Sequence, residues 1–165
     1  MRVYLPATLR SLRAGVLAGE FGPPPVAGCA VTPQLREWFA AGDAEELEYA
    51  ALGDAARAGL HLLDLDALAP RRRVVVAAEV PADWVVPEPD RGRSAVRVDH
   101  AVPVARVVSG HVDDTAAEVA VAAAADAVVA AELGSDDAQF VVDEADGHAL
   151  MWYAAQELDA LVELV

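Results

Sequence analysis

The first third of the chain combines short extended stretches with apolar residues at helical spacing. A strand is predicted at residues 2–5, followed by a helix capped by Thr8 whose apolar positions recur at i, i+3 and i+7. A second strand is predicted at 29–31. Helices over 32–42 and 43–63 follow, because each opens on a typical N-cap residue, threonine before proline or aspartate before a glutamate three residues on.

The middle of the chain is richer in strands. Residues 73–80 form a strongly apolar stretch typical of a buried strand, and the proline-containing segment 81–94 is predicted as a surface loop. Two extended stretches, 95–102 and 104–109, follow, and the alternation of valine with charged residues in the first predicts one solvated face. An alanine-rich helix is expected over 115–133.

The last part is predicted to hold one more strand, 139–142, and a final helix with apolar residues Leu150, Tyr153, Ala154, Leu158, Leu161 and Val162. The predicted element order is therefore βαβαα, a strand-rich stretch, then βαβα. Alternating strands and helices favour an α/β or α+β fold. We expect one layered domain over 1–165, with a mixed, partly parallel sheet of five to six strands and helices packed on it.

A weak internal sequence similarity suggests a duplication. Tyr49-Ala50-Ala51 and Tyr153-Ala154-Ala155 fall at matching places in the predicted order. Two βαβα halves, 1–68 and 104–165, would then be joined by a strand-rich insert, 69–103. Alanine-rich segments also resemble each other by chance, so both explanations stay open.

Composition and charge exclude several classes of protein. With 165 residues, 55% of them hydrophobic, the chain can bury a core, whereas a net charge of −15 argues against nucleic acid or an anionic membrane surface as partner. No apolar run approaches the ~20 residues of a membrane span. The single cysteine, Cys29, excludes an internal disulfide. A cytoplasmic location is expected.

The charge is unevenly distributed. Residues 67–106 contain seven arginines and five acids, whereas residues 107–165 contain thirteen acids and no arginine. The chain has no lysine at all. A molecule with a pronounced dipole is predicted, whose acidic C-terminal part either faces its own arginines or offers an anionic surface to a cationic partner.

Two groups of acids and histidines are the candidates for metal binding. Each follows a predicted strand, and parallel neighbours would bring both to one sheet edge, where open α/β sheets bind ligands. Carboxylates and imidazoles there would hold a divalent ion. Helix capping is the simpler explanation of the acids, with Asp113 or Asp114 at one helix start and Asp146 at another. The candidate metal ligands are His111, Asp113, Asp143, Asp146 and His148.

Established catalytic motifs are absent from the sequence. None of the serines lies in a G-x-S-x-G elbow, and a chain without lysine cannot form a P-loop of the usual kind. Cys29 lies in an apolar predicted strand, where an inert buried thiol is expected. We therefore expect no catalytic residue and no cofactor, with a divalent metal ion as the alternative.

Four residues are candidates for interaction with a partner. Arg71, Arg72 and Arg73 belong to the most basic region, which would suit a phosphate or an acidic protein, although such runs also pair with a protein's own acids. Trp84, in a proline-rich loop, is a candidate for an exposed contact.

Four stretches carry a resemblance to a known family: VYLPATL, AVTPQLREWFAAGDAEELEYAALGDAAR, RRRVVVAAEVP and AQFVVDEADGHALMWYAAQEL. Together they resemble an uncharacterised actinobacterial family that is catalogued only as a domain of unknown function. The lack of isoleucine, asparagine and lysine agrees with a GC-rich genome. The resemblance implies a single domain over the whole chain and no assigned activity, cofactor or catalytic residue.

The sequence therefore leads to two functional hypotheses. The first is a small acidic cytoplasmic protein without catalysis that acts through binding another protein or a second copy of itself. The second is a metal-dependent, hydrolase-like enzyme that uses the acid and histidine groups.

Overall fold

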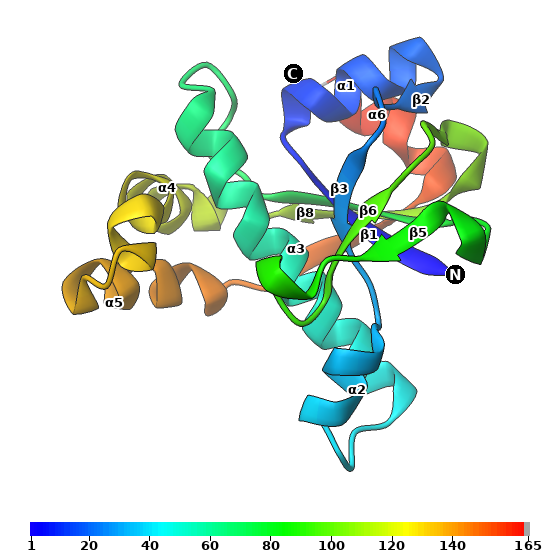
Figure 1. Ribbon diagram of the computed structural model, residues 1–165. Coiled ribbons are helices and arrows are strands. Elements are labelled where there is room, and N and C mark those ends of the chain that lie inside the picture. Colours follow the sequence, from blue (N-terminus) through cyan, green and yellow to red (C-terminus); the bar gives the residue numbers. More distant parts are fainter. Residues whose placement is uncertain (164–165) are drawn as a thin grey trace.

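The computed structural model describes residues 1–163 and centres on a seven-stranded sheet (Figure 1). The strand order is β5-β6-β3-β1-β4-β8-β9, and every neighbouring pair is antiparallel. A separate two-stranded ladder joins β2 (Glu20–Phe21) to β7 (Val102–Pro103). The strands of the main sheet are β1 (Arg2–Ala7), β3 (Val26–Cys29), β4 (Val74–Glu79), β5 (Val85–Pro87), β6 (Ala95–Val98), β8 (Val107–Asp113) and β9 (Leu150–Ala154).

Helices cover both faces of this sheet. In Figure 1, α1 and α6 lie together on one side, and the long α3 crosses the other. The pair α4 and α5 lies to one side, where it packs against α3. The helices are α1 (Leu9–Ala18), α2 (Pro33–Trp38), α3 (Ala44–Leu65), α4 (Glu118–Glu132), α5 (Asp136–Asp146) and α6 (Leu158–Val162), with short 3₁₀ turns at η1 (Ala82–Trp84), η2 (Pro89–Arg91), η3 (Val104–Arg106), η4 (Thr115–Ala117) and η5 (Ala155–Glu157).

The first three helices begin where the sequence predicted. The side chains of Thr8, Thr32 and Asp43 each accept a hydrogen bond from the backbone N–H three residues on. These bonds satisfy amide groups that have no partner within the helix.

Alternation along the central strands divides the core between the two faces. Val3 and Leu5 of β1 pack with α1 and α6, whereas Tyr4 between them packs with α3. β4 behaves in the same way, with Val75 on the α3 side. Both faces of β1 and β4 are therefore buried, which explains the unbroken apolar stretch at 74–78 within the predicted strand 73–80.

The α4–α5 hairpin is an insertion between the adjacent strands β8 and β9. Its core lies against the second half of α3, where Leu60 and Leu63 pack with Val121 and Val128. The small alanine side chains of α4 permit this close packing.

The prediction of a partly parallel sheet of five to six strands is wrong. The strands of the main sheet number seven, and none of those described is parallel to its neighbour. The α+β alternative is confirmed. The alternating order of strands and helices suggested parallel strands joined by βαβ crossovers. Instead, α4 and α5 connect the antiparallel neighbours β8 and β9, and α2 and α3 connect β3 to β4, which are not neighbours in the sheet.

Two elements near the C-terminus differ from their predicted type. Residues 139–142, predicted as a strand, lie in α5, which Ser135 caps and whose Val142 and Ala145 are buried one helical turn apart. Residues 150–154, predicted as part of the last helix, form β9. Local β propensity in Phe140–Val142 misled the first prediction, because packing of α5 on α4 decides its conformation.

The duplication stays a prediction, although the two similar segments lie in different types of secondary structure. Tyr49-Ala50-Ala51 belongs to α3, whereas Tyr153 and Ala154 end β9. Among residues 1–163, no helix is long and apolar enough to cross a membrane.

Candidate functional site

A buried ion pair occupies the place where the metal site was expected. Arg73, just before β4, donates from Nε and Nη2 to the two carboxylate oxygens of Asp113, at 2.8 and 2.9 Å. The Arg73 backbone N–H donates to the same carboxylate at 2.8 Å. Both side chains are almost completely buried, at 2% and 0% exposure. Asp113 therefore has its oxygens engaged by the protein itself.

The same guanidinium also contacts residues at the C-terminal end of α5 and just beyond it. Its Nη2 donates to the carbonyl oxygens of Ala145 and His148, at 3.0 and 2.9 Å. Asp146 lies 3.8 Å from Nη1. The structure thus brings Asp113, Asp146 and His148 together around a cation of the protein, which links the α4–α5 hairpin to the sheet.

The remaining two predicted ligands lie elsewhere. Asp143 is 3.4 Å from the exposed Arg57, which also pairs with Asp146. The His111 ring contacts the Ser109 hydroxyl at 3.1 Å on β8, and burial, helped by the nearby charge of Arg2, lowers its pKa. In the part of the chain that the structure describes, no group of three or more His, Cys, Asp or Glu residues is arranged to hold a metal ion.

The capping interpretation of the acids fits Asp114 by its position alone. Asp114 precedes the turn before α4 but makes no side-chain bond to its amides. Asp146 ends α5 and so caps no helix start.

The four predicted interaction residues all have partners within the chain. Arg71 donates to the carbonyls of Leu63, Asp66 and Ala69 around the end of α3, and Arg72 to that of Asp113. Trp84 stacks on His100 at 4.4 Å, with Arg106 over its ring. These contacts agree with the alternative that the basic run serves the protein's own structure.

Cys29 has the environment of an inert thiol. It is buried between β1 and α3, and desolvation raises its pKa to about 11, although a hydrogen bond with Ser94 acts in the opposite direction. A thiol with this pKa is almost wholly protonated at neutral pH and is a poor nucleophile.

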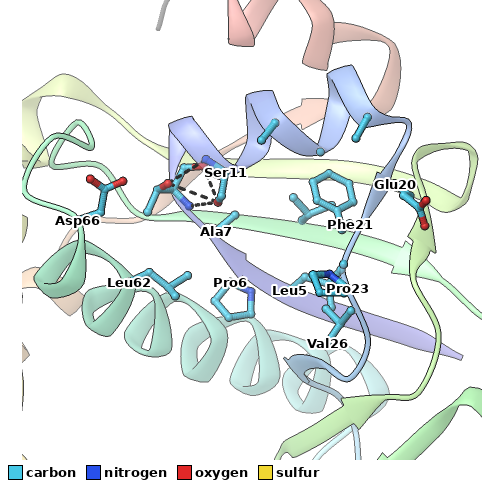
Figure 2. A pocket seen from close by; sticks show the side chains of 16 residues that line it. Leu5, Pro6, Ala7, Ser11, Glu20, Phe21, Pro23, Val26, Leu62 and Asp66 are labelled. Atoms are coloured by element: carbon cyan, nitrogen blue, oxygen red, sulfur yellow. Dashed lines mark hydrogen bonds between the residues drawn. The ribbon is translucent and has the colours of Figure 1, made fainter.

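A cavity with a volume of about 530 Å³ is lined by residues of α1, α3, β1 and β3. Figure 2 shows its lining side chains, with α1 on one side and α3 on the other. Leu5, Phe21 and Val26 give it an apolar wall. The polar groups at one end already bond within the chain, since Thr8 and Ser11 exchange hydrogen bonds at 2.8 and 3.0 Å. We assign no ligand to this cavity.

The edge strand β9 exposes backbone groups that face no other described strand. The Ala154 N–H donates to the Glu157 carboxylate at 2.7 Å, outside the ladder with β8. Because backbone groups alternate in direction along a strand, those of Leu150 and Trp152 also point away from β8. The Trp152 side chain is 63% exposed, and Met151 is exposed on the opposite face.

The two edges of the sheet differ in protection. β5 has only three residues, ends in Pro87 and is followed by a turn that begins with Pro89. Proline and short length are common devices that block strand addition at an edge. The five residues of β9 include no proline, glycine or charge. β9 is therefore the edge at which another strand can pair.

This edge was not predicted from the sequence, because residues 150–154 were expected to be helical. One signal was present: Gly147 separates an acidic helical stretch from an uncharged run containing tryptophan and tyrosine, which are enriched in strands.

Amide hydrogen exchange tests the direction of these backbone groups. We expect the amides of Leu150 and Trp152 to exchange faster than those of Met151 and Tyr153, because only the latter two point toward β8. The measurement is residue-resolved exchange by NMR on the isolated protein. Equal protection along the strand would contradict the proposed free edge.

The comparisons with known proteins give a family and no activity. A family model described as "Family of unknown function (DUF6912)" matches residues 1–162. No curated protein and no solved structure matches. The resemblance to a family of unknown function is confirmed, whereas its actinobacterial lineage and the cytoplasmic location stay predictions.

Proposed function

The chain belongs to this family of unknown function, and we propose that it acts without catalysis, by binding an extended segment of a partner protein as an added strand beside β9. The observation that carries the proposal is the uncharged β9 edge with outward backbone groups at Leu150 and Trp152. Main-chain hydrogen bonds supply affinity in strand addition, and pockets or exposed side chains beside them supply specificity. Trp152 provides a large aromatic surface of the kind that dominates binding energy at interfaces.

Charge around β9 favours a cationic partner over a second copy. Residues 143–163 hold six acids and no arginine or lysine, and of these acids Asp143 and Asp146 pair with Arg57 of α3. Two β9 strands pairing across a two-fold axis would bring these acids close to their equivalents in the other copy. A partner strand carrying lysine or arginine would find complementary charge, which also accelerates association.

Substitution of Trp152 separates strand addition from simple apolar contact. Trp152→Pro removes both the ring and the outward N–H, whereas Trp152→Val removes the ring but keeps a good strand former. We expect Trp152→Pro to abolish partner binding and Trp152→Val to weaken it about thirtyfold or more. The matched control is Tyr49→Leu, which removes an exposed aromatic ring from α3.

Quantitative affinity capture from the source cells, followed by titration with a peptide from the captured protein, provides the measurement. The proposal is supported if the captured protein contains a lysine- or arginine-rich segment whose peptide protects the Leu150 and Trp152 amides from exchange. The peptide should also dissociate as the salt concentration rises. Binding that survives Trp152→Pro, or protection elsewhere in the chain, would refute the proposal. A dimer that depends on Trp152 would replace the cationic partner with a second copy.

A further inference from the structure

A second surface, distinct from the β9 edge, is a groove beside α3 with a volume of about 900 Å³. α3 forms one wall through Asp54, and the segment before β6 forms the opposite wall through Arg91 and Arg93. Trp38, the last residue of α2, also lines the groove. We name it the Trp38 groove, after this residue.

The Arg93 guanidinium lies over the Trp38 ring, with 3.6 Å between its central carbon and the ring centroid. Within residues 1–163, no carboxylate or carbonyl accepts a hydrogen bond from this guanidinium. Arg57, by comparison, pairs with Asp143 and Asp146. Stacking fixes the plane of the Arg93 group and leaves its N–H donors available at the edge.

The backbone on both sides of Arg93 is held in place. Its carbonyl accepts a hydrogen bond from the buried Thr32 hydroxyl, and Thr32 is the N-cap of the helix that carries Trp38. The next residue, Ser94, is buried and donates to Asp54 of α3 at 2.5 Å. These bonds link the Arg93 segment to both α2 and α3, so the stacked pair belongs to an organised site.

The other arginine–tryptophan pair of the described chain shows what is distinctive here. Trp84 has His100 stacked 4.4 Å from it and Arg106 over its ring at 5.2 Å. It is only partly exposed. Trp38 has Arg93 as its stacking partner and remains 63% exposed. A further planar group therefore has room beside Trp38.

We propose that the Trp38 groove binds a small planar aromatic molecule that carries an anionic group. The ring would stack on the exposed surface of Trp38, and a carboxylate or phosphate would accept paired hydrogen bonds from Arg93, whereas Arg91 already pairs with Glu88 at 3.2 Å. The volume of the groove suits a small-molecule ligand. This binding is independent of strand addition at β9.

NMR titration tests the proposal through the indole N–H signal of Trp38. The probes are 2-naphthoate and adenosine 5′-monophosphate, which distinguish a carboxylate from a phosphate, with 2-naphthamide and adenosine as neutral counterparts. We expect one anion to shift the Trp38 signal and its neutral counterpart to bind at least about tenfold more weakly.

Variants assign the binding to the stacked pair. Arg93→Gln should reduce affinity at least about tenfold, Arg93→Lys by less, and Trp38→Leu about fivefold. Arg106→Gln, which alters the other arginine–tryptophan pair, should leave binding unchanged. The proposal fails if neither anion shifts Trp38 at about 5 mM, several times a weak dissociation constant of about 1 mM. It also fails if Arg93→Gln binds as the unchanged protein does.

Discussion

Asp113→Asn is expected to lower the free energy of unfolding by about 3–5 kcal/mol. The substitution keeps the size of the side chain but removes the negative charge that faces the fully buried Arg73. Breaking one member of a buried ion pair leaves the other charge without compensation in a poorly solvated place. Urea denaturation followed by circular dichroism provides the measurement.

The matched control is Arg57→Gln, which breaks an exposed pair with Asp143 and Asp146. Exposed ion pairs contribute about 0–1 kcal/mol, so this variant should unfold almost as the unchanged protein does. The double variant Arg73→Met with Asp113→Leu should cost less than the two single changes together, because no lone charge remains buried. A loss below about 1 kcal/mol for Asp113→Asn would contradict the structural role of the pair.

The second large effect concerns the contact between β8 and α6. Leu158 is 2% exposed, and its Cδ2 would lie 2.7 Å from a Cβ added to Gly110. Leu158→Ala opens a cavity in the core and should cost about 2–5 kcal/mol. Gly110→Ala crowds the same contact and should cost about 1–3 kcal/mol.

The combination Gly110→Ala with Leu158→Ala tests whether both effects share one contact. The smaller side chain at 158 makes room for the added methyl group, so the double variant should be clearly more stable than the sum of the two losses predicts. Urea denaturation of the unchanged protein, the two single variants and the double variant provides the measurement. Strict additivity would show that α6 does not lie on Gly110 as described.

Part of the candidate site could be predicted from residue types alone. Asp113, Asp146 and His148 belong to the groups predicted from the sequence, and the structure brings these residues together around Arg73. The metal interpretation stays a prediction, and the cation that the structure places among them is Arg73, because a metal ion and a buried guanidinium both attract carboxylates. Only the sheet register, which places Arg73 beside the end of β8, identifies the partner.

Short-range information was sufficient for the elements whose signals are local. Thr8, Thr32 and Asp43 cap helices because the bond from a capping side chain spans three residues. The apolar stretch at 73–80 is a central strand because both its faces are buried. The negative charge of residues 107–165 could likewise be predicted, because it follows from residue types and requires no contact.

Tertiary structure decided what depends on distant partners. Residues 139–142 become helical through packing on α4, and residues 150–154 become an edge strand through pairing with β8. Sheet order, strand direction and the position of Trp38 under Arg93 also come from contacts between residues far apart in the chain. The sequence by itself determined the starts of α1, α2 and α3 and the buried strand β4, because their signals are local. Contacts between distant residues alone determined that the β9 edge and the Trp38 groove remain open.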